Sequence, residues 1–146
     1  MATLQEMLLT PDVQPKAVAD LQALVQSEVD GKGGISGTAV KAAYKVVTAF
    51  APGYYLETVT SMLPDMANAL QPYWADFLAS GGADFGDYLA KHGDEVSESM
   101  LAVTDHMAAV SGRAAIVKAY QMVRGSASKN IVAALPALGA MVQKYS

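Results

Sequence analysis

Residues 94–110 read Asp-Glu-Val-Ser-Glu-Ser-Met-Leu-Ala-Val-Thr-Asp-His-Met-Ala-Ala-Val, and their spacing indicates the fold class. At helical periodicity, five apolar side chains share one arc of about 80°, namely Val96, Met100, Val103, Met107 and Val110. Asp94 caps this predicted helix, and the acids of its first turn suit the positive end of the helix dipole. The alternation of polar and apolar residues that marks a strand is absent throughout the chain. We therefore predict an all-α protein.

Towards the N-terminus, capping and breaking residues predict further helices. Thr3 and Glu6 have the spacing of a capping box, which predicts a short helix ending near Leu9. Pro15 suits the first turn of a second helix, and Gly31 suits its end. Each of these signals satisfies or removes backbone groups that a helix end leaves without a partner.

The middle of the chain continues the helical pattern between prolines. A third helix begins near the N-cap candidate Ser36 and ends before Pro52. Residues 54–80 are helical with interruptions, since Pro64 and Pro72 each either begin a new helix or kink one.

Three further helices are expected around and after residues 94–110. Asp84 caps a short helix, and Ser111 is the N-cap of a helix that Gly125 closes. The last helix begins near Ser128 and contains Pro136. The expected architecture is one compact bundle of about seven to eight helices over residues 1–146.

The two halves of the chain present caps and breakers in the same order. The matching positions are Thr3-Leu4 with Asp84-Phe85, Ser36-Gly37 with Ser111-Gly112, Tyr44 with Tyr120, Leu63-Pro64 with Leu135-Pro136, Gln71 with Gln143, and Tyr73 with Tyr145. Two interpretations are open. The chain holds two tandem repeated helical units, residues 1–80 and 83–146, or the halves look alike because both are rich in alanine, which supplies 26 residues.

Six short stretches carry a resemblance to a known family: Asp20–Val25, Ser36–Ala42, Tyr73–Asp76, Phe85–Leu89, Leu101–Asp105 and Leu135-Pro136. In these stretches the chain resembles a family of small, uncharacterised, all-helical actinobacterial proteins. The resemblance covers nearly the full length. It implies a helical fold and a single domain, and it assigns no functional residue because no activity is assigned to that family.

Composition excludes several classes of protein. The chain has 146 residues and no cysteine, which excludes disulfides, iron–sulfur clusters, thiol catalysis and zinc sites built on cysteine. Its net charge of −4 argues against a nucleic-acid partner held by bulk charge. The first six residues lack a basic start, and the longest uncharged apolar stretch, 130–143, is shorter than the roughly 20 residues that span a bilayer. We expect no membrane segment and a cytoplasmic protein.

Catalytic and metal-binding patterns are missing from the sequence. The two histidines, His92 and His106, form no pair at metal-ligand spacing, so we expect no metal and no cofactor. The glycines of residues 31–37 lack the fingerprint of a phosphate-binding loop. Carboxylates between Asp84 and Glu98 fall where helix starts are predicted. Without a nucleophile, base and orienting group at usable spacing, we expect a protein that is not an enzyme.

Basic residues gather in the last third of the chain. Residues 106–146 hold Arg113, Lys118, Arg124, Lys129 and Lys144 and no acid, whereas all 14 acids lie before residue 106. One interpretation is a basic patch for a phosphate or an acidic partner, formed by Arg113, Lys118, Arg124 and Lys129. The other is pairing within the molecule, because Arg113 and Arg124 fall near Tyr120 on the helical wheel.

Aromatic residues crowd the middle of the chain, and Tyr73, Trp74 and Phe77 are the candidate binding residues. They belong to the core, line an apolar pocket between the two helical halves, or form an interaction surface for a partner. Charged residues make up 16% of the chain, against about 25% in an average domain, so the helices present little polar surface. The favoured hypothesis is therefore an interaction module without enzyme activity, with a protein partner or a second copy. The alternative is a protein that binds a small apolar ligand.

Overall fold

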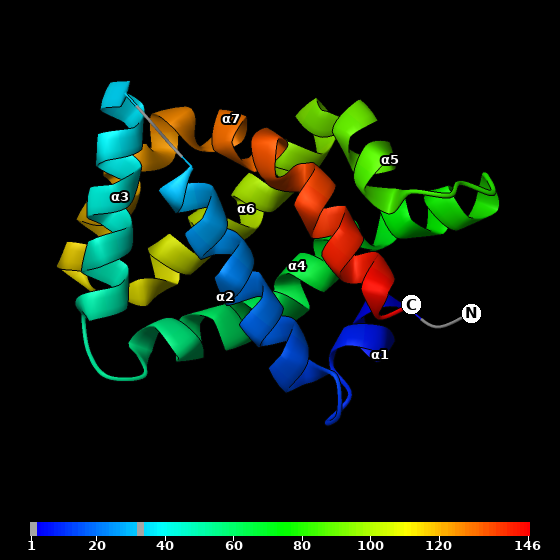
Figure 1. Cartoon of the computed structure of the whole chain (residues 1–146). Helices are drawn as coiled ribbons and strands as arrows, with labels where there is room; N and C mark the ends of the chain where they lie inside the picture. The colour runs from blue at the N-terminus through cyan, green and yellow to red at the C-terminus, as the bar shows by residue number, and fades with distance from the viewer. Residues whose placement is uncertain (1–2, 32–33) are drawn as a thin grey trace.

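Helix caps and breakers divide the chain into seven helices in the computed structural model, which describes residues 3–31 and 34–146 (Figure 1). Within those ranges no strand is formed. The helices are α1 (Leu4–Leu8), α2 (Gln14–Asp30), α3 (Gly34–Ala49), α4 (Tyr54–Ala79), α5 (Phe85–Lys91), α6 (Gly93–Ser111) and α7 (Ala114–Lys144). The predictions of an all-α fold and of seven to eight helices are confirmed.

The predicted caps of the two short helices are present. Thr3 Oγ1 accepts a hydrogen bond from the Glu6 backbone N–H at 3.1 Å and so begins α1. Asp84 Oδ1 accepts one from the Asp87 N–H at 3.0 Å and so begins α5. Each side chain satisfies a backbone donor that has no partner within its own helix.

The C-terminal region differs from the prediction, since α7 is one continuous helix where two were expected. Gly125 lies inside α7 and does not close a helix. A helical glycine costs about 1 kcal/mol relative to alanine. The packing of α7 against α2, α3, α5 and α6 outweighs that cost. Pro136 also lies inside α7, and Ser128 is an interior residue of it.

The start of α7 also corrects the prediction for Ser111. Gly112 has a φ of 65°, and this left-handed residue ends α6 one position after Ser111. Ser111 is therefore the last residue of α6, and Arg113 is the N-cap residue of α7. The predicted Asp94 cap is likewise wrong, because α6 begins at Gly93 and Asp94 lies in its first turn.

Prolines do not divide α4, which runs unbroken through Pro64 and Pro72. The alternative in which each proline begins a new helix is therefore wrong, because both prolines lie inside one helix. The backbone of α3 begins at Gly34, two residues before the predicted cap. The Ser36 side chain lies outside the described part of the structure, so the cap itself stays a prediction.

The core lies where α7 and α4 meet the short helices (Figure 1). Its largest fully buried apolar side chains are Leu4, Leu8, Leu63, Leu70, Phe85, Leu89, Val96, Leu135 and Val142. The C-terminal end of α7 passes beside α2, where Lys144 Nζ lies 3.0 Å from Asp20 Oδ2. Among the described residues, no helix combines the length and the apolar character needed to cross a membrane.

Candidate functional site

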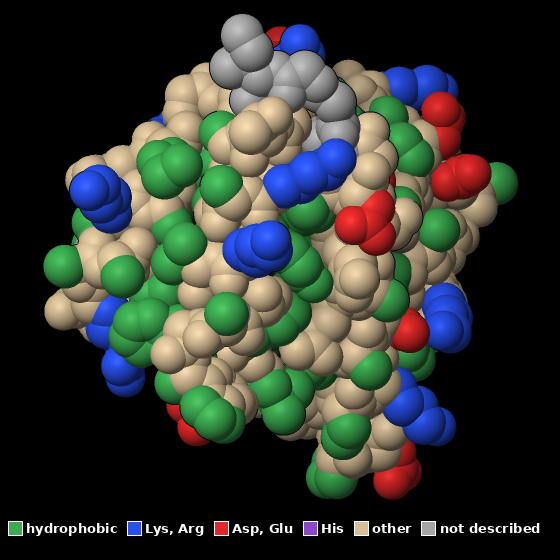
Figure 2. Space-filling model, turned by 60° about the vertical axis from the view of Figure 1, so that its left-hand side comes forward, with side chains coloured by type: hydrophobic (Ala, Val, Ile, Leu, Met, Phe, Trp, Pro, Cys, Tyr) green, Lys and Arg blue, Asp and Glu red, His purple; other side chains and the backbone are tan. Residues whose placement is uncertain are grey.

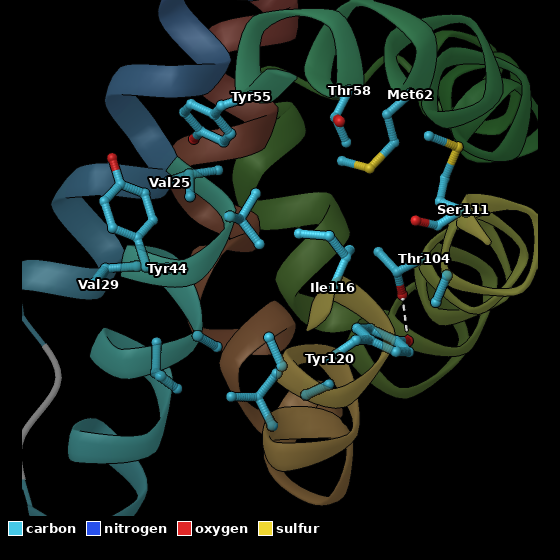
Figure 3. A pocket seen from close by; sticks show the side chains of 18 of the residues that line it. Val25, Val29, Tyr44, Tyr55, Thr58, Met62, Thr104, Ser111, Ile116 and Tyr120 are labelled. Carbon is cyan, nitrogen blue, oxygen red and sulfur yellow. Dashed lines mark hydrogen bonds between the residues drawn. The ribbon is translucent and has the colours of Figure 1, made fainter. Parts of the chain in front are cut away.

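A cavity of about 440 Å³ lies between α2, α3, α4, α6 and α7, and it is partly open to solvent. Its wall is mainly apolar, with side chains such as Val25, Val29, Met62, Ile116 and Val123. Figure 3 shows side chains from these helices surrounding an open space, with Tyr44 and Tyr55 on one side and Thr104, Ser111 and Tyr120 on the other. A volume of this size lies within the range of about 300–1,000 Å³ that is typical of small-molecule sites.

Two hydroxyl groups in the wall are buried without a hydrogen-bond partner among the described residues. They are Tyr55 Oη and Ser111 Oγ. A buried hydroxyl that makes no hydrogen bond costs about 1–3 kcal/mol, so native structures rarely leave one without a reason. In Figure 3 the Ser111 hydroxyl is directed toward the open space. A ligand with a polar atom on that side could therefore satisfy it.

Three other polar side chains of the wall already make hydrogen bonds. Tyr120 Oη lies 2.8 Å from Thr104 Oγ1 and donates to Asp105 Oδ1 at 2.5 Å. Thr58 Oγ1 donates to the Tyr54 backbone carbonyl at 2.9 Å. These hydrogen bonds fix the side chains of Thr58, Thr104 and Tyr120, and the surface that faces the cavity is mainly apolar.

Two tyrosines of the wall, Tyr55 and Tyr120, have raised pKa values. Burial raises the pKa of Tyr55 far above its ordinary value, and the neighbouring Tyr44 hydroxyl adds to the effect. The two rings pack edge to face with centroids 5.8 Å apart, yet the two hydroxyl groups do not meet the geometry of a hydrogen bond. Burial also raises the pKa of Tyr120, and its hydrogen bond to Asp105 adds to the shift. Tyr55 and Tyr120 are therefore neutral phenols at physiological pH.

A cation lies next to this cavity, at the loop between α6 and α7. Arg113 Cζ is 5.1 Å from the ring centroid of Tyr54, a wall residue, and 5.1 Å from that of Phe50. Val110, another wall residue, is 62% exposed, so this end of the cavity reaches the surface. Arg113 forms no ion pair with a described residue.

The aromatic residues predicted as binding residues lie elsewhere. Trp74 and Phe77 are each 3% exposed and belong to the core, where both rings pack against Phe85 at centroid distances of 4.9 and 5.2 Å. Tyr73 is half-buried, and its hydroxyl lies 3.3 Å from Ser99 Oγ. None of the three lines the cavity between α2, α3, α4, α6 and α7. A role for them in ligand binding stays a prediction.

The basic residues predicted as a patch have separate surroundings along α7. Arg124 pairs with Asp105 through both carboxylate oxygens, at 2.8 and 3.1 Å. That pairing holds the pKa of Asp105 below its usual range, through the Arg124 and Tyr120 hydrogen bonds in that order. Arg113 stacks on aromatic rings, and Lys118 and Lys129 are exposed. Arg124 thus takes the predicted intramolecular pairing, and a patch formed by the four residues stays a prediction.

Most residues of the cavity wall were not singled out from the sequence. Valines and alanines at helical spacing look the same whether they fill a core or surround a space. Tyr54 and Tyr55 also belong to the aromatic-rich middle of the chain, and both line the cavity. Among the described residues, no group of three or more His, Asp or Glu side chains is arranged to hold a metal ion.

The fold and the cavity define an all-α protein with an apolar chamber among its helices. The chain belongs to a family of unknown function, DUF6918, whose model matches residues 4–146. The resemblance to a family of uncharacterised proteins is therefore confirmed, and the actinobacterial origin stays a prediction. No curated protein and no solved structure matches the chain significantly.

Proposed function

We propose that the protein binds a small, largely apolar molecule in the cavity between α2, α3, α4, α6 and α7. The observation that carries the proposal is an apolar space of about 440 Å³ whose wall contains two buried hydroxyl groups without partners, Tyr55 Oη and Ser111 Oγ. The apolar wall would supply most of the affinity, since burying apolar surface contributes about 25 cal/mol per Å². The Ser111 hydroxyl, which is directed toward the open space, would orient the ligand (Figure 3).

The cavity volume sets the size of the ligand. An apolar cavity of roughly 150 Å³ accommodates benzene, with its six carbon atoms. By the same proportion, about 440 Å³ accommodates roughly 17 non-hydrogen atoms. An alkyl chain of about 14 to 16 carbons that ends in a small polar group, or a substituted bicyclic aromatic compound, has this size.

We also propose that residues 1–80 and 83–146 are two copies of one helical unit, with the cavity between them. Matched hydrogen bonds support this proposal. Gln71 Oε1 accepts from the Leu4 N–H at 2.7 Å, and Gln143 Oε1 accepts from the Phe85 N–H at 3.0 Å. Wall residues also occur in pairs at equivalent positions: Val40 with Ile116, Ala43 with Ala119, Tyr44 with Tyr120, and Val47 with Val123.

A matched pair of variants on α6 tests ligand binding. Ala108 lines the cavity, whereas its neighbour Ala109 is exposed. Ala108→Phe should fill part of the space and weaken binding of prodan, a neutral naphthalene dye, by at least about tenfold. Ala109→Phe should leave binding unchanged. The blue shift of prodan emission on titration measures the affinity, and a circular dichroism spectrum checks each fold.

Methyl resonances of the wild-type protein give a second readout that needs no variant. Prodan should shift the signals of Ile116 and Val29, which line the cavity, more than those of Leu8 and Leu89 in the core. Absence of dye binding to the wild type, or equal shifts in both groups, would overturn the proposal.

The favoured hypothesis from the sequence, an interaction module, has no comparable observation behind it. The exposed large hydrophobic side chains of the described part are Val46, Leu56, Val110 and Met122, each on a different helix. Figure 2 shows hydrophobic side chains spread between single charged ones on the face that α3 forms. Scattered apolar side chains are normal on a monomer. A protein partner, self-association and a cytoplasmic location stay predictions.

A further inference from the structure

We infer that the ligand is a single-chain amphiphile with a carboxylate, whose chain fills the cavity and whose headgroup meets Arg113; this inference rests on the proposed function. Its basis is the position of Arg113 beside the exposed end of a mainly apolar space. Arg113 lies two residues after Ser111 and three before Ile116, and both of these line the cavity. Its guanidinium group lies over the ring of a third wall residue, Tyr54.

The contacts of Arg113 leave its hydrogen-bonding edge available. The guanidinium carbon lies 5.1 Å from the ring centroids of both Phe50 and Tyr54, a distance at which a cation is attracted to the face of an aromatic ring. These contacts hold the group in place without using a carboxylate. The five N–H donors of arginine lie in the plane of the group and match the two oxygens of a carboxylate.

The charges around Arg113 favour an anion as its partner. Arg113 makes no ion pair with a described residue, whereas Arg124 on the same helix is neutralised by Asp105. The first turn of α7, which follows Arg113, contains no acidic residue. An anionic headgroup would therefore find an unpaired cation, and Glu57 is the one acid in the first turn of α4, on whose Tyr54 ring Arg113 lies.

The volume of the cavity favours a ligand with one alkyl chain over a ligand with two. Roughly 17 non-hydrogen atoms correspond to a carboxylate with about 14 to 16 carbons. A lipid with two chains of that length has at least twice as many atoms and exceeds the cavity. The buried Ser111 hydroxyl, close to Arg113 in the chain, would bond the same headgroup.

Displacement of prodan by tetradecanoate and by tetradecanol tests the inference, because the two compounds share a chain and differ in charge. The wild type should bind tetradecanoate about tenfold more tightly than tetradecanol. Arg113→Gln should remove this difference by weakening tetradecanoate alone, and Arg113→Lys should restore part of it. Lys129→Gln, an exposed basic residue of α7, is the control for net charge and should change neither affinity.

The outcomes separate the inference from the proposed function. If the wild type binds prodan and both tetradecyl compounds equally, and Arg113→Gln changes nothing, the carboxylate inference is overturned and the cavity still binds ligand. An equal effect of Lys129→Gln would also overturn it, since general charge would then explain the preference. If the wild type binds none of the three compounds, the proposed function itself fails.

Discussion

The two short helices dock on their long neighbours in different ways, although they occupy matching places in the chain. In the first half, α1 docks on α4 with the Gln5 side chain, whose Nε2 donates to the Pro64 carbonyl at 3.1 Å. In the order of the second half, Pro136 corresponds to Pro64, and Gly86, the residue after Phe85, corresponds to Gln5, the residue after Leu4. A Cβ added to Gly86 would lie 2.4 Å from the Pro136 carbonyl oxygen, so here backbone meets backbone.

This difference shows that the order of caps and breakers does not determine how closely a short helix packs against its long neighbour. Gln71 and Gln143 make the same hydrogen bond to the first N–H of α1 and α5. The separation of the helices then depends on side-chain size at the contact. Glycine at 86 and 139 allows α5 to approach α7 closely, whereas Gln5 and Ala67 occupy the matching positions in the first half.

The largest effect is expected from Gly139→Ala. A Cβ at this position would lie 2.3 Å from Gly86 Cα, and backbone atoms cannot move aside cheaply. We expect a loss of about 3 kcal/mol in the free energy of unfolding. The reverse change in the first half, Ala67→Gly, should cost only about 1 kcal/mol. Urea denaturation followed by circular dichroism measures both, and a smaller loss for Gly139→Ala would contradict the comparison.

A smaller effect is expected from the two glutamines that the halves share. Gln143→Leu removes the acceptor of the Phe85 N–H and the donor to the Ala83 carbonyl, whereas Gln71→Leu removes the acceptor of the Leu4 N–H. We expect losses of about 1.5 and about 1 kcal/mol, because each variant leaves one part-buried N–H unpaired, whereas the exposed Ala83 carbonyl can turn to water and adds less. The same denaturation series tests the order. Equal losses would mean that the bond to the Ala83 carbonyl adds nothing.

The smallest effect concerns pH and the contact between α7 and α2. The Tyr145 hydroxyl donates to Asp20, and this bond, with Lys144 nearby, lowers the pKa of Asp20 below its ordinary value of 3.8. A lowered carboxyl pKa in the folded state stabilises the fold above pH 3.8, and this contribution is lost as the pH falls through the folded value.

The exposed Lys144 limits this contribution to at most about 1 kcal/mol, because water screens the ion pair. Tyr73, which corresponds to Tyr145 in the order of the first half, has its hydroxyl 3.3 Å from the Ser99 hydroxyl in place of a carboxylate. Asp20→Asn should therefore lose less stability than the wild type between pH 7 and pH 3. Parallel pH curves for the two proteins would show that Asp20 contributes no pH dependence.

The sequence by itself determined the helical class and most helix ends. Caps such as Thr3 and Asp84 act within three residues, so their geometry follows from local sequence. The same local rules predicted the wrong ends at Gly125 and Ser111. Gly125 stays helical because α7 packs against four other helices, and the left-handed Gly112 keeps Ser111 in α6.

Tertiary structure alone decided where the cavity lies and which residues surround it. Trp74 and Phe77 were the more conspicuous candidates, yet both fill the core, while valines, alanines and Tyr55 surround the space. Helical periodicity identifies the face of a helix that is turned inward, and it carries no information on whether that face meets another side chain or an open volume. That outcome depends on how closely α3, α6 and α7 approach one another, which is set by contacts between residues far apart in the sequence.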